Sequence, residues 1–196
     1  MAKVGITGGI GAGKSLIASM VEALGHPVYY ADSQAKRLMS ESLYIKEELV
    51  ALLGLDAYIG NTLNRPYIAQ AIFGNNELLQ KINALVHPAV KADFEAWAAQ
   101  RGDAPLLFLE SALIYEAQLP TILDAVIHVT APLRVRISRT MRRDSVSENE
   151  VLKRVAAQQK EEESAQKADF TICNDNQTAL TPQLKSILEE LKKRKI

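Results

Sequence analysis

The sequence predicts an α/β fold in which a parallel five-stranded sheet carries helices on both faces. Short apolar runs alternate with longer segments whose apolar residues recur at helical spacing, and a glycine-rich turn joins the first strand to the first helix. The expected strands are residues 3–7, 27–32, 105–111, 125–131 and 169–175.

Composition is that of an ordinary soluble globule of 196 residues, with 47% hydrophobic and 23% charged residues. Lys plus Arg equals Asp plus Glu at 23 each, so charge gives no reason to expect a nucleic-acid or membrane partner. Cys173 is the single cysteine, and no signal peptide or membrane-spanning run is visible. We expect a cytoplasmic protein, and a monomer, with an oligomer left open.

The first strand, loop, helix and strand fit within about 30 residues, which is the size of a βαβ unit. Residues 3–7 are a β-branched run that ends in glycines, and an apolar helical stripe follows the loop. Gly25 is expected just past the helix, and Pro27 prevents its continuation. The second strand is then expected to end at Asp32.

Residues 33–100 interrupt this alternation with a series of helical patterns and no strong strand signal. His87 and Pro88 are expected at a helix start. The segment is longer than a crossover connection requires, so we expect a helical subdomain.

The chain after the fourth strand alternates again between helices and one strand. A basic helix is expected near residues 133–144, and a second helix over residues 147–167. Ser147 and Glu150 form a capping-box pattern at the start of that second helix. A helix with one apolar side closes the chain.

Gly8 to Ser15 reads GGIGAGKS and matches the P-loop pattern G-x-x-x-x-G-K-[ST]. Bare glycines let backbone N–H groups converge on phosphate oxygens, and the following helix adds the positive end of its dipole. Lys14 is expected to reach the β- and γ-phosphates, and the Ser15 hydroxyl to hold Mg²⁺. A plain glycine-rich turn is the alternative, but the position between a predicted strand and helix favours the P-loop.

The absence of two motifs typical of GTPases limits the kinds of P-loop protein that the sequence can encode. The guanine-specific N-K-x-D pattern and a D-x-x-G pattern are both absent from the sequence, which disfavours a GTP switch. An ATP-using transferase and a hydrolytic motor remain. The helical insertion could hold an acceptor, so transfer is favoured.

Two carboxylates are expected at strand ends, where open parallel sheets bind ligands. Asp32 could accept the proton of an attacking hydroxyl or orient it, or could merely cap the next helix. Glu110 could orient Mg²⁺ through water or bind the acceptor, or could face solvent.

Five arginines fall within ten residues and suit a mobile arm that closes over ATP and excludes water. The alternative is a solvated basic helix face. They are Arg134, Arg136, Arg139, Arg142 and Arg143.

Several motifs follow one another along the chain. They are the P-loop TGGIGAGKS at Thr7–Ser15, an A-D pair at Ala31–Asp32, an L-x-R segment at Leu63–Arg65 with a following I-F pair at Ile72–Phe73, an H-P pair at His87–Pro88, the arginines Arg139 and Arg143, an R-x-x-x-Q element at Arg154–Gln158 and a closing A-D-x-x-I-x-N at Ala168–Asn174. In this ordered set the sequence resembles the dephospho-coenzyme A kinase family over nearly the whole chain.

Several positions depart from the family pattern. Leu16 replaces a Thr near the α-phosphate, and Tyr30 takes the first place of a D-A-D triplet. Glu110 and Asn64 each stand where the family has Asp.

The resemblance implies ATP-dependent transfer to the ribose 3′-hydroxyl of dephospho-coenzyme A, the last step of coenzyme A biosynthesis. It implies a nucleotide-kinase-like core at residues 1–32, 101–133 and 155–196. It further implies a helical acceptor subdomain at residues 33–100 and a basic lid at residues 134–154.

The resemblance also implies roles for single residues. Asp32 would be the base or the acceptor-orienting carboxylate, and Arg65, His87 and Glu110 would bind the acceptor. The expected nucleotide contacts are Gly9, Gly11, Ala12, Gly13, Lys14, Ser15, Leu16 and, near the adenine, Asn174.

Catalysis would rest on Lys14 and Asp32, with Arg139 and Arg143 stabilising charge on the transferring phosphoryl group. Two alternatives stay open. One is another P-loop nucleoside or metabolite kinase, and the other is a regulatory protein that binds ATP without transfer.

Overall fold

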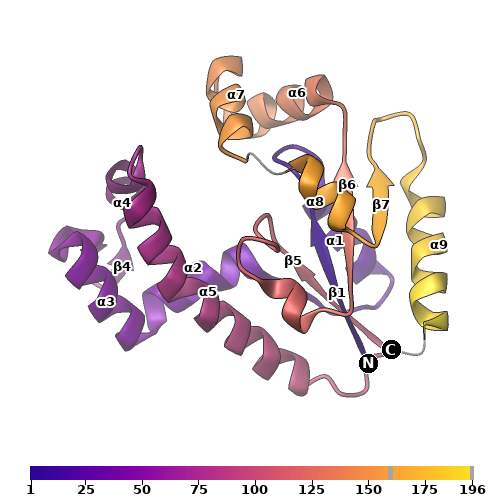
Figure 1. Ribbon diagram of the computed structural model, residues 1–196, viewed down its shortest axis with the longest axis horizontal. Coiled ribbons are helices and arrows are strands. Elements are labelled where there is room, and N and C mark those ends of the chain that lie inside the picture. The colour runs from indigo at the N-terminus through magenta and orange to yellow at the C-terminus, as the bar shows by residue number, and fades with distance from the viewer. Residues whose placement is uncertain (159–160, 195–196) are drawn as a thin grey trace. The chain divides into compact units, whose positions relative to one another are not determined.

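The structure, a computed structural model, describes residues 1–158 and 161–194 (Figure 1). Its contacts divide the chain into two compact units. The first unit is Met1–Tyr30 with Arg101–Ile196, and the second is Ala31–Gln100.

The first unit is built on a five-stranded parallel sheet in the order β2-β5-β1-β6-β7. This confirms the predicted fold class. The strands are β1 (Ala2–Thr7), β2 (Val28–Tyr30), β5 (Leu106–Glu110), β6 (Ala125–Thr130) and β7 (Phe170–Cys173).

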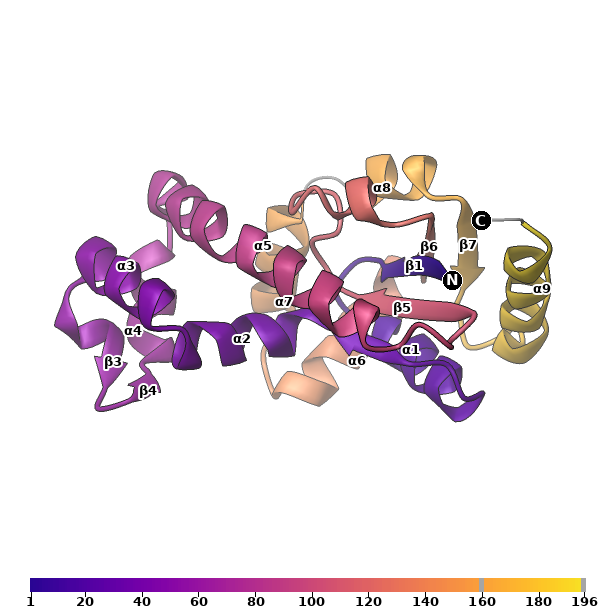
Figure 2. The same cartoon turned by 90° about the horizontal axis from the view of Figure 1, so that it is seen from below.

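Helices cover both faces of this sheet. Helices α1 (Lys14–Ala23) and α9 (Leu180–Lys193) contribute Ile17, Val21 and Leu188 to the buried core of the strands. Figure 2 shows α8 (Glu161–Lys167) on the face opposite α1. The segment that includes η2 (Leu119–Ile122) also packs on the sheet, where a Cβ on Gly5 would lie 2.6 Å from the Ile114 Cδ1.

Helices α6 (Leu133–Asp144) and α7 (Glu148–Ala157) follow β6. The predicted capping box is confirmed, because the Ser147 hydroxyl accepts from the Glu150 N–H and the Glu150 carboxylate accepts from the Ser147 N–H. The single helix predicted over residues 147–167 is wrong. The chain instead ends α7 at Ala157 and begins α8 at Glu161.

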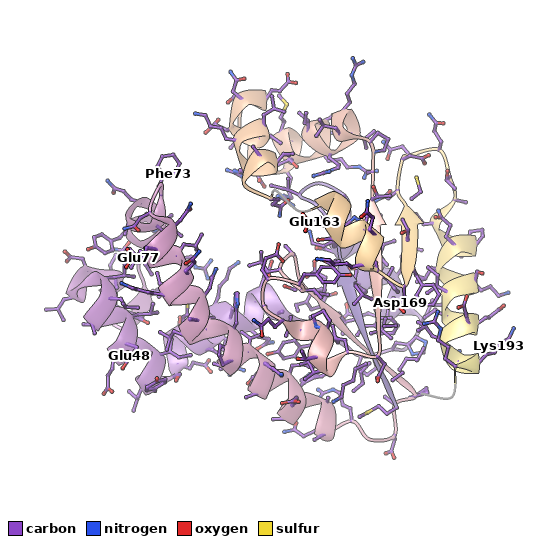
Figure 3. The ribbon with its side chains drawn as sticks, viewed as in Figure 1. Glu48, Phe73, Glu77, Glu163, Asp169 and Lys193 are labelled. Carbon is purple, nitrogen blue, oxygen red and sulfur yellow. The ribbon has the colours of Figure 1, made fainter. Side chains whose placement is uncertain are left out.

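The second unit is mainly helical. Its helices are α2 (Ala31–Glu41), α3 (Leu43–Leu53), η1 (Leu55–Ala57), α4 (Arg65–Ile72) and α5 (Asn76–Ala99). Phe73 directly follows α4 and is 85% exposed (Figure 3).

This unit also contains a small hairpin that the sequence reading did not predict. Strands β3 (Tyr58–Ile59) and β4 (Thr62–Leu63) pair antiparallel around the two-residue turn Gly60-Asn61. Gly60 has a φ of 61°, a conformation that glycine adopts readily. A Gly-Asn pair between short apolar runs is a hairpin signal, so the sequence did carry this information.

Helix α5 runs through Pro88 without a break, so the expected helix start at His87 and Pro88 is wrong. A proline inside a helix removes one backbone hydrogen bond. The buried residues Ile82, Val86, Val90 and Phe94 recur every four positions on both sides of it. This continuous buried stripe holds the helix together where local propensity would end it. No helix within the described residues is long and apolar enough to cross a membrane.

Candidate active site

The loop between β1 and α1 folds around its own lysine. Lys14 is the first residue of α1, and its Nζ donates to the carbonyl oxygens of Gly8 at 3.0 Å and Gly9 at 3.5 Å. The ammonium group therefore lies against the loop whose N–H groups were predicted to bind phosphate. Gly13 precedes the helix in a left-handed conformation with a φ of 99°.

Gly8, Gly11 and Gly13 of this loop have positive φ angles, and atoms of neighbouring elements lie too close to them to leave room for a side chain. A Cβ on Gly8 would clash with the Val129 carbonyl oxygen of β6, and one on Gly11 with the Arg136 carbonyl oxygen of α6. A Cβ on Gly13 would clash with the Asn174 amide nitrogen. The loop is thus fitted between β6, α6 and the residue that follows β7.

Gly13→Ala should lower the free energy of unfolding by about 2–4 kcal/mol, because a positive φ and a steric clash both oppose the new Cβ. Gly25→Ala is the matched control. Gly25 has a φ of 85° but nothing within 4 Å of an added Cβ, so we expect a loss of only about 1–2 kcal/mol. Urea unfolding of both variants measures the difference. Equal losses would show that the Asn174 contact does not constrain the loop.

Ser15 and Glu110 meet at the carboxyl end of the sheet. The Ser15 hydroxyl donates to the Glu110 Oε1 at 3.4 Å. Glu110 is the last residue of β5, lies beside Ile6 of β1 and Tyr30 of β2, and is only 6% exposed. The alternative that Glu110 faces solvent is therefore wrong.

This pair of oxygen groups fits the predicted Mg²⁺ site. Hydroxyl and carboxylate oxygens suit Mg²⁺, which commonly binds through one or two protein groups together with water and substrate phosphates. Within residues 1–158 and 161–194, no group of three or more His, Cys, Asp or Glu side chains could hold a metal ion. Phosphate oxygens and water would have to supply the remaining ligands.

Asp32 does not end the second strand as predicted. Strand β2 ends at Tyr30, and Asp32 is the second residue of α2. Helix α2 already begins at Ala31, so the alternative role of Asp32 as the residue that caps this helix is also wrong. The carboxylate lies in the first helical turn, where negative charge interacts favourably with the helix dipole.

Arg65 and His87 belong to the same unit as Asp32. Arg65 is the first residue of α4, while His87 lies in the middle of α5. Asn64 caps α4, because its Oδ1 accepts from the Tyr67 N–H at 3.4 Å and its Nδ2 donates to the Asp56 carbonyl oxygen at 2.9 Å. The family's Asp could accept the first bond but could not donate the second.

The structure separates the two predicted lid arginines. Arg139 donates to the carbonyl oxygens of Gly11 and Ala12, both at 3.4 Å, and so contacts the phosphate loop. Arg143 is exposed and binds its neighbour Asp144 at 2.7 Å. The Arg143 guanidinium, with a smaller contribution from Arg154, holds the pKa of Asp144 below its usual range.

Asn174 joins the loop to Arg139. Its Nδ2 donates to the Ala12 carbonyl oxygen at 2.8 Å, and its Oδ1 accepts from the Arg139 Nη2 at 3.0 Å. Arg139 also donates to Asn176, and Asn174 is only 5% exposed. Asn174 thus holds the loop from one side, whereas its predicted place near the adenine stays a prediction.

Two further side chains contact the loop: Arg136, one of the five arginines expected to close over ATP, and Gln158, to which the sequence assigned no role. The Arg136 Nε donates to the Ile10 carbonyl oxygen at 2.9 Å, and the Gln158 Oε1 accepts from the Ile10 N–H at 2.7 Å. Arg136 shares a helix face with Arg139 by i, i+3 spacing, and this spacing could have indicated that both arginines contact the loop. Gln158 ends the R-x-x-x-Q element and gave no other signal.

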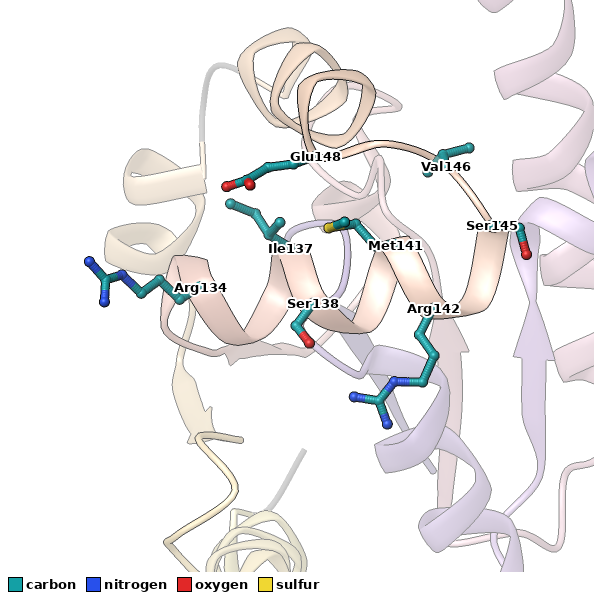
Figure 4. Close-up of a pocket in the computed structure, with 8 residues that line it drawn as sticks. All are labelled: Arg134, Ile137, Ser138, Met141, Arg142, Ser145, Val146 and Glu148. Carbon is teal, nitrogen blue, oxygen red and sulfur yellow. The ribbon is translucent and has the colours of Figure 1, made fainter.

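A hollow of about 790 Å³ beside α6 and α7 is separate from these contacts (Figure 4). It contains Arg134 and Arg142, two of the five arginines expected to close over ATP, but none of the residues expected to act in catalysis or to bind the nucleotide, acceptor or metal. Its lining is Arg134, Ile137, Ser138, Met141, Arg142, Ser145, Val146 and Glu148. Helical spacing places Arg134, Ser138 and Arg142 on the side of α6 opposite Arg136.

Comparison with known proteins identifies the family. Residues 2–179 match the family model described as dephospho-CoA kinase. The dephospho-CoA kinase of Porphyromonas gingivalis is 37% identical over 193 residues, which cover 98% of this chain and 95% of that protein. The Bacteroides fragilis dephospho-CoA kinase is 33% identical over 186 residues, or 95% and 91% of the two chains.

Solved structures agree with the fold. A Thermus thermophilus crystal structure has a TM-score of 0.83 at 33% identity and covers 100% of this chain and 98% of its own. A shikimate kinase from Acinetobacter baumannii has a TM-score of 0.60 at 17% identity, with 100% and 96% covered, and supports the fold alone. The phosphate loop therefore belongs to a kinase, and the chain is a member of the dephospho-CoA kinase family.

Proposed function

We propose that this chain transfers the γ-phosphoryl group of ATP to the ribose 3′-hydroxyl of dephospho-coenzyme A, giving coenzyme A and ADP. The observation that carries the proposal is the loop Gly8–Ser15, with Lys14 inside it and Ser15 beside Glu110, in a chain of this family. The family does not favour another metabolite kinase or a non-catalytic ATP-binding protein.

The nucleotide is held by the first unit. Loop N–H groups and the start of α1 surround the phosphates, and Lys14 reaches the β- and γ-phosphates. Its Nζ is 3.0 Å from the Gly8 carbonyl oxygen and therefore lies at the loop that would hold the phosphates. Arg139 and Asn174 hold the carbonyl side of the same loop.

Mg²⁺ would be held by the Ser15 hydroxyl, with Glu110 beside it. When bound, it supplies positive charge to the β- and γ-phosphates. Glu110 is one methylene longer than the family's Asp, and its burial keeps the carboxylate at the loop. We assign Glu110 to this side of the site in preference to the acceptor side.

The acceptor is bound by the helical unit. Asp32 accepts the proton of the 3′-hydroxyl or orients that hydroxyl, and Arg65 and His87 bind acceptor groups. The segment 134–154 acts as the lid, and Arg143 must leave Asp144 if it is to reach the transferring phosphoryl group.

Incubation of the protein with ATP, Mg²⁺ and dephospho-coenzyme A should give coenzyme A and ADP in equal amounts. Mass spectrometry counts the added phosphate, and ³¹P NMR places it on the 3′-oxygen. Shikimate and adenosine serve as alternative acceptors. Turnover with either of these but not with dephospho-coenzyme A would reject the substrate, and binding of ATP without any transfer would favour the regulatory alternative.

A further inference from the structure

Ile10, the third residue of the phosphate loop, is held at both ends of its backbone. Its N–H donates to the Gln158 Oε1 at 2.7 Å, and its carbonyl oxygen accepts from the Arg136 Nε at 2.9 Å. Arg136 is only 5% exposed, so this contact is shielded from water.

These two side chains come from opposite ends of one helical hairpin. Arg136 lies in the first turn of α6, and Gln158 directly follows α7. Figure 1 shows α6 and α7 beyond the carboxyl ends of β1 and β6. Both ends of the α6–α7 hairpin therefore contact the same residue of the phosphate loop, Ile10.

The position of Lys14 indicates which phosphate Ile10 would lie nearest. P-loop lysines contact the β- and γ-phosphates. The Lys14 Nζ lies against the Gly8 and Gly9 carbonyl oxygens, which directly precede Ile10. Ile10 therefore lies at the γ-phosphate end of the loop, and Gln158 lies beside it.

We propose that Gln158 is a positioning residue for phosphoryl transfer, which fixes the Ile10 amide at the γ-phosphate end of the loop. The proposal rests on the proposed function. A carboxamide suits this position because its oxygen accepts the Ile10 N–H without adding negative charge near the triphosphate. A carboxylate would accept the same hydrogen bond but repel the terminal phosphate.

Gln158→Met, Gln158→Glu and the control Gln166→Met test the proposal. Gln166 is an exposed residue of α8. Calorimetric titration with Mg-ATP and Mg-ADP gives the two affinities, and steady-state rates give kcat and the KM for dephospho-coenzyme A.

For Gln158→Met we expect ATP affinity to fall about tenfold, which corresponds to one lost hydrogen bond. The KM for dephospho-coenzyme A should stay within about twofold of wild type. For Gln158→Glu, ATP affinity should fall about tenfold more than ADP affinity, a difference that a merely structural role would not produce.

Gln158→Met behaving as Gln166→Met, or binding ATP more tightly than wild type, would overturn the proposal. Equal losses of ATP and ADP affinity in Gln158→Glu would also overturn it. This variant keeps an acceptor oxygen, so it tests the proposal even if Gln158→Met does not fold. If wild type binds ATP but makes no coenzyme A, the substrate assignment fails while the binding comparison still decides the role of Gln158.

Discussion

Lys14→Ala should abolish measurable transfer and weaken ATP binding. The substitution removes the ammonium group that faces the phosphate loop, where it lies 3.0 Å from the Gly8 carbonyl oxygen. Preorganised positive charge at a developing phosphoryl transition state is usually the largest catalytic contribution of such a site. We expect kcat to fall by at least about 10³-fold, measured as coenzyme A formed at saturating ATP.

Lys185→Ala is the matched control for this variant. Lys185 lies on α9, and its side chain is 76% exposed. Its removal should leave kcat and ATP affinity unchanged, since surface ion pairs contribute little. A Lys14→Ala protein that is folded and transfers phosphate at the rate of Lys185→Ala would contradict the assigned role of the loop.

Asp32→Asn should leave ATP binding intact and lower kcat by about 10²–10⁴-fold, the usual contribution of a positioned general base. The amide has nearly the same shape as the carboxylate but cannot accept the proton of the attacking hydroxyl. Calorimetry measures ATP binding, and single-turnover kinetics measure the transfer step.

Asp56→Asn is the control, because Asp56 is an exposed acidic residue of the same helical unit. It should behave as wild type. Full activity in Asp32→Asn would limit Asp32 to a stabilising charge in the first turn of α2, and the base would have to be sought among other residues.

The sequence predicted the sheet well because its strands are continuous apolar runs bounded by breakers. Each of the five expected runs overlaps an observed strand, with differences of at most two residues at either end. Asp32 shows that even such a small error changes the structural position expected for a site residue. A shift of two residues moves this carboxylate from a strand end into the first turn of a helix.

Tertiary contacts determine features that the sequence alone could not predict. The local preference of Pro88 favours a helix break, yet buried residues on both sides keep α5 continuous. The sequence placed five arginines close together but could not show that Arg139 contacts the loop whereas Arg143 binds Asp144. The Gln158 contact joins residues 148 positions apart, and no local pattern could reveal it.

A crystal structure with a non-hydrolysable ATP analogue, Mg²⁺ and dephospho-coenzyme A tests the central claim most directly. We predict that the triphosphate lies in the loop Gly8–Ser15, with Mg²⁺ on the Ser15 hydroxyl and the ribose 3′-oxygen in line with the γ-phosphorus. A triphosphate bound elsewhere with this loop empty would contradict the account.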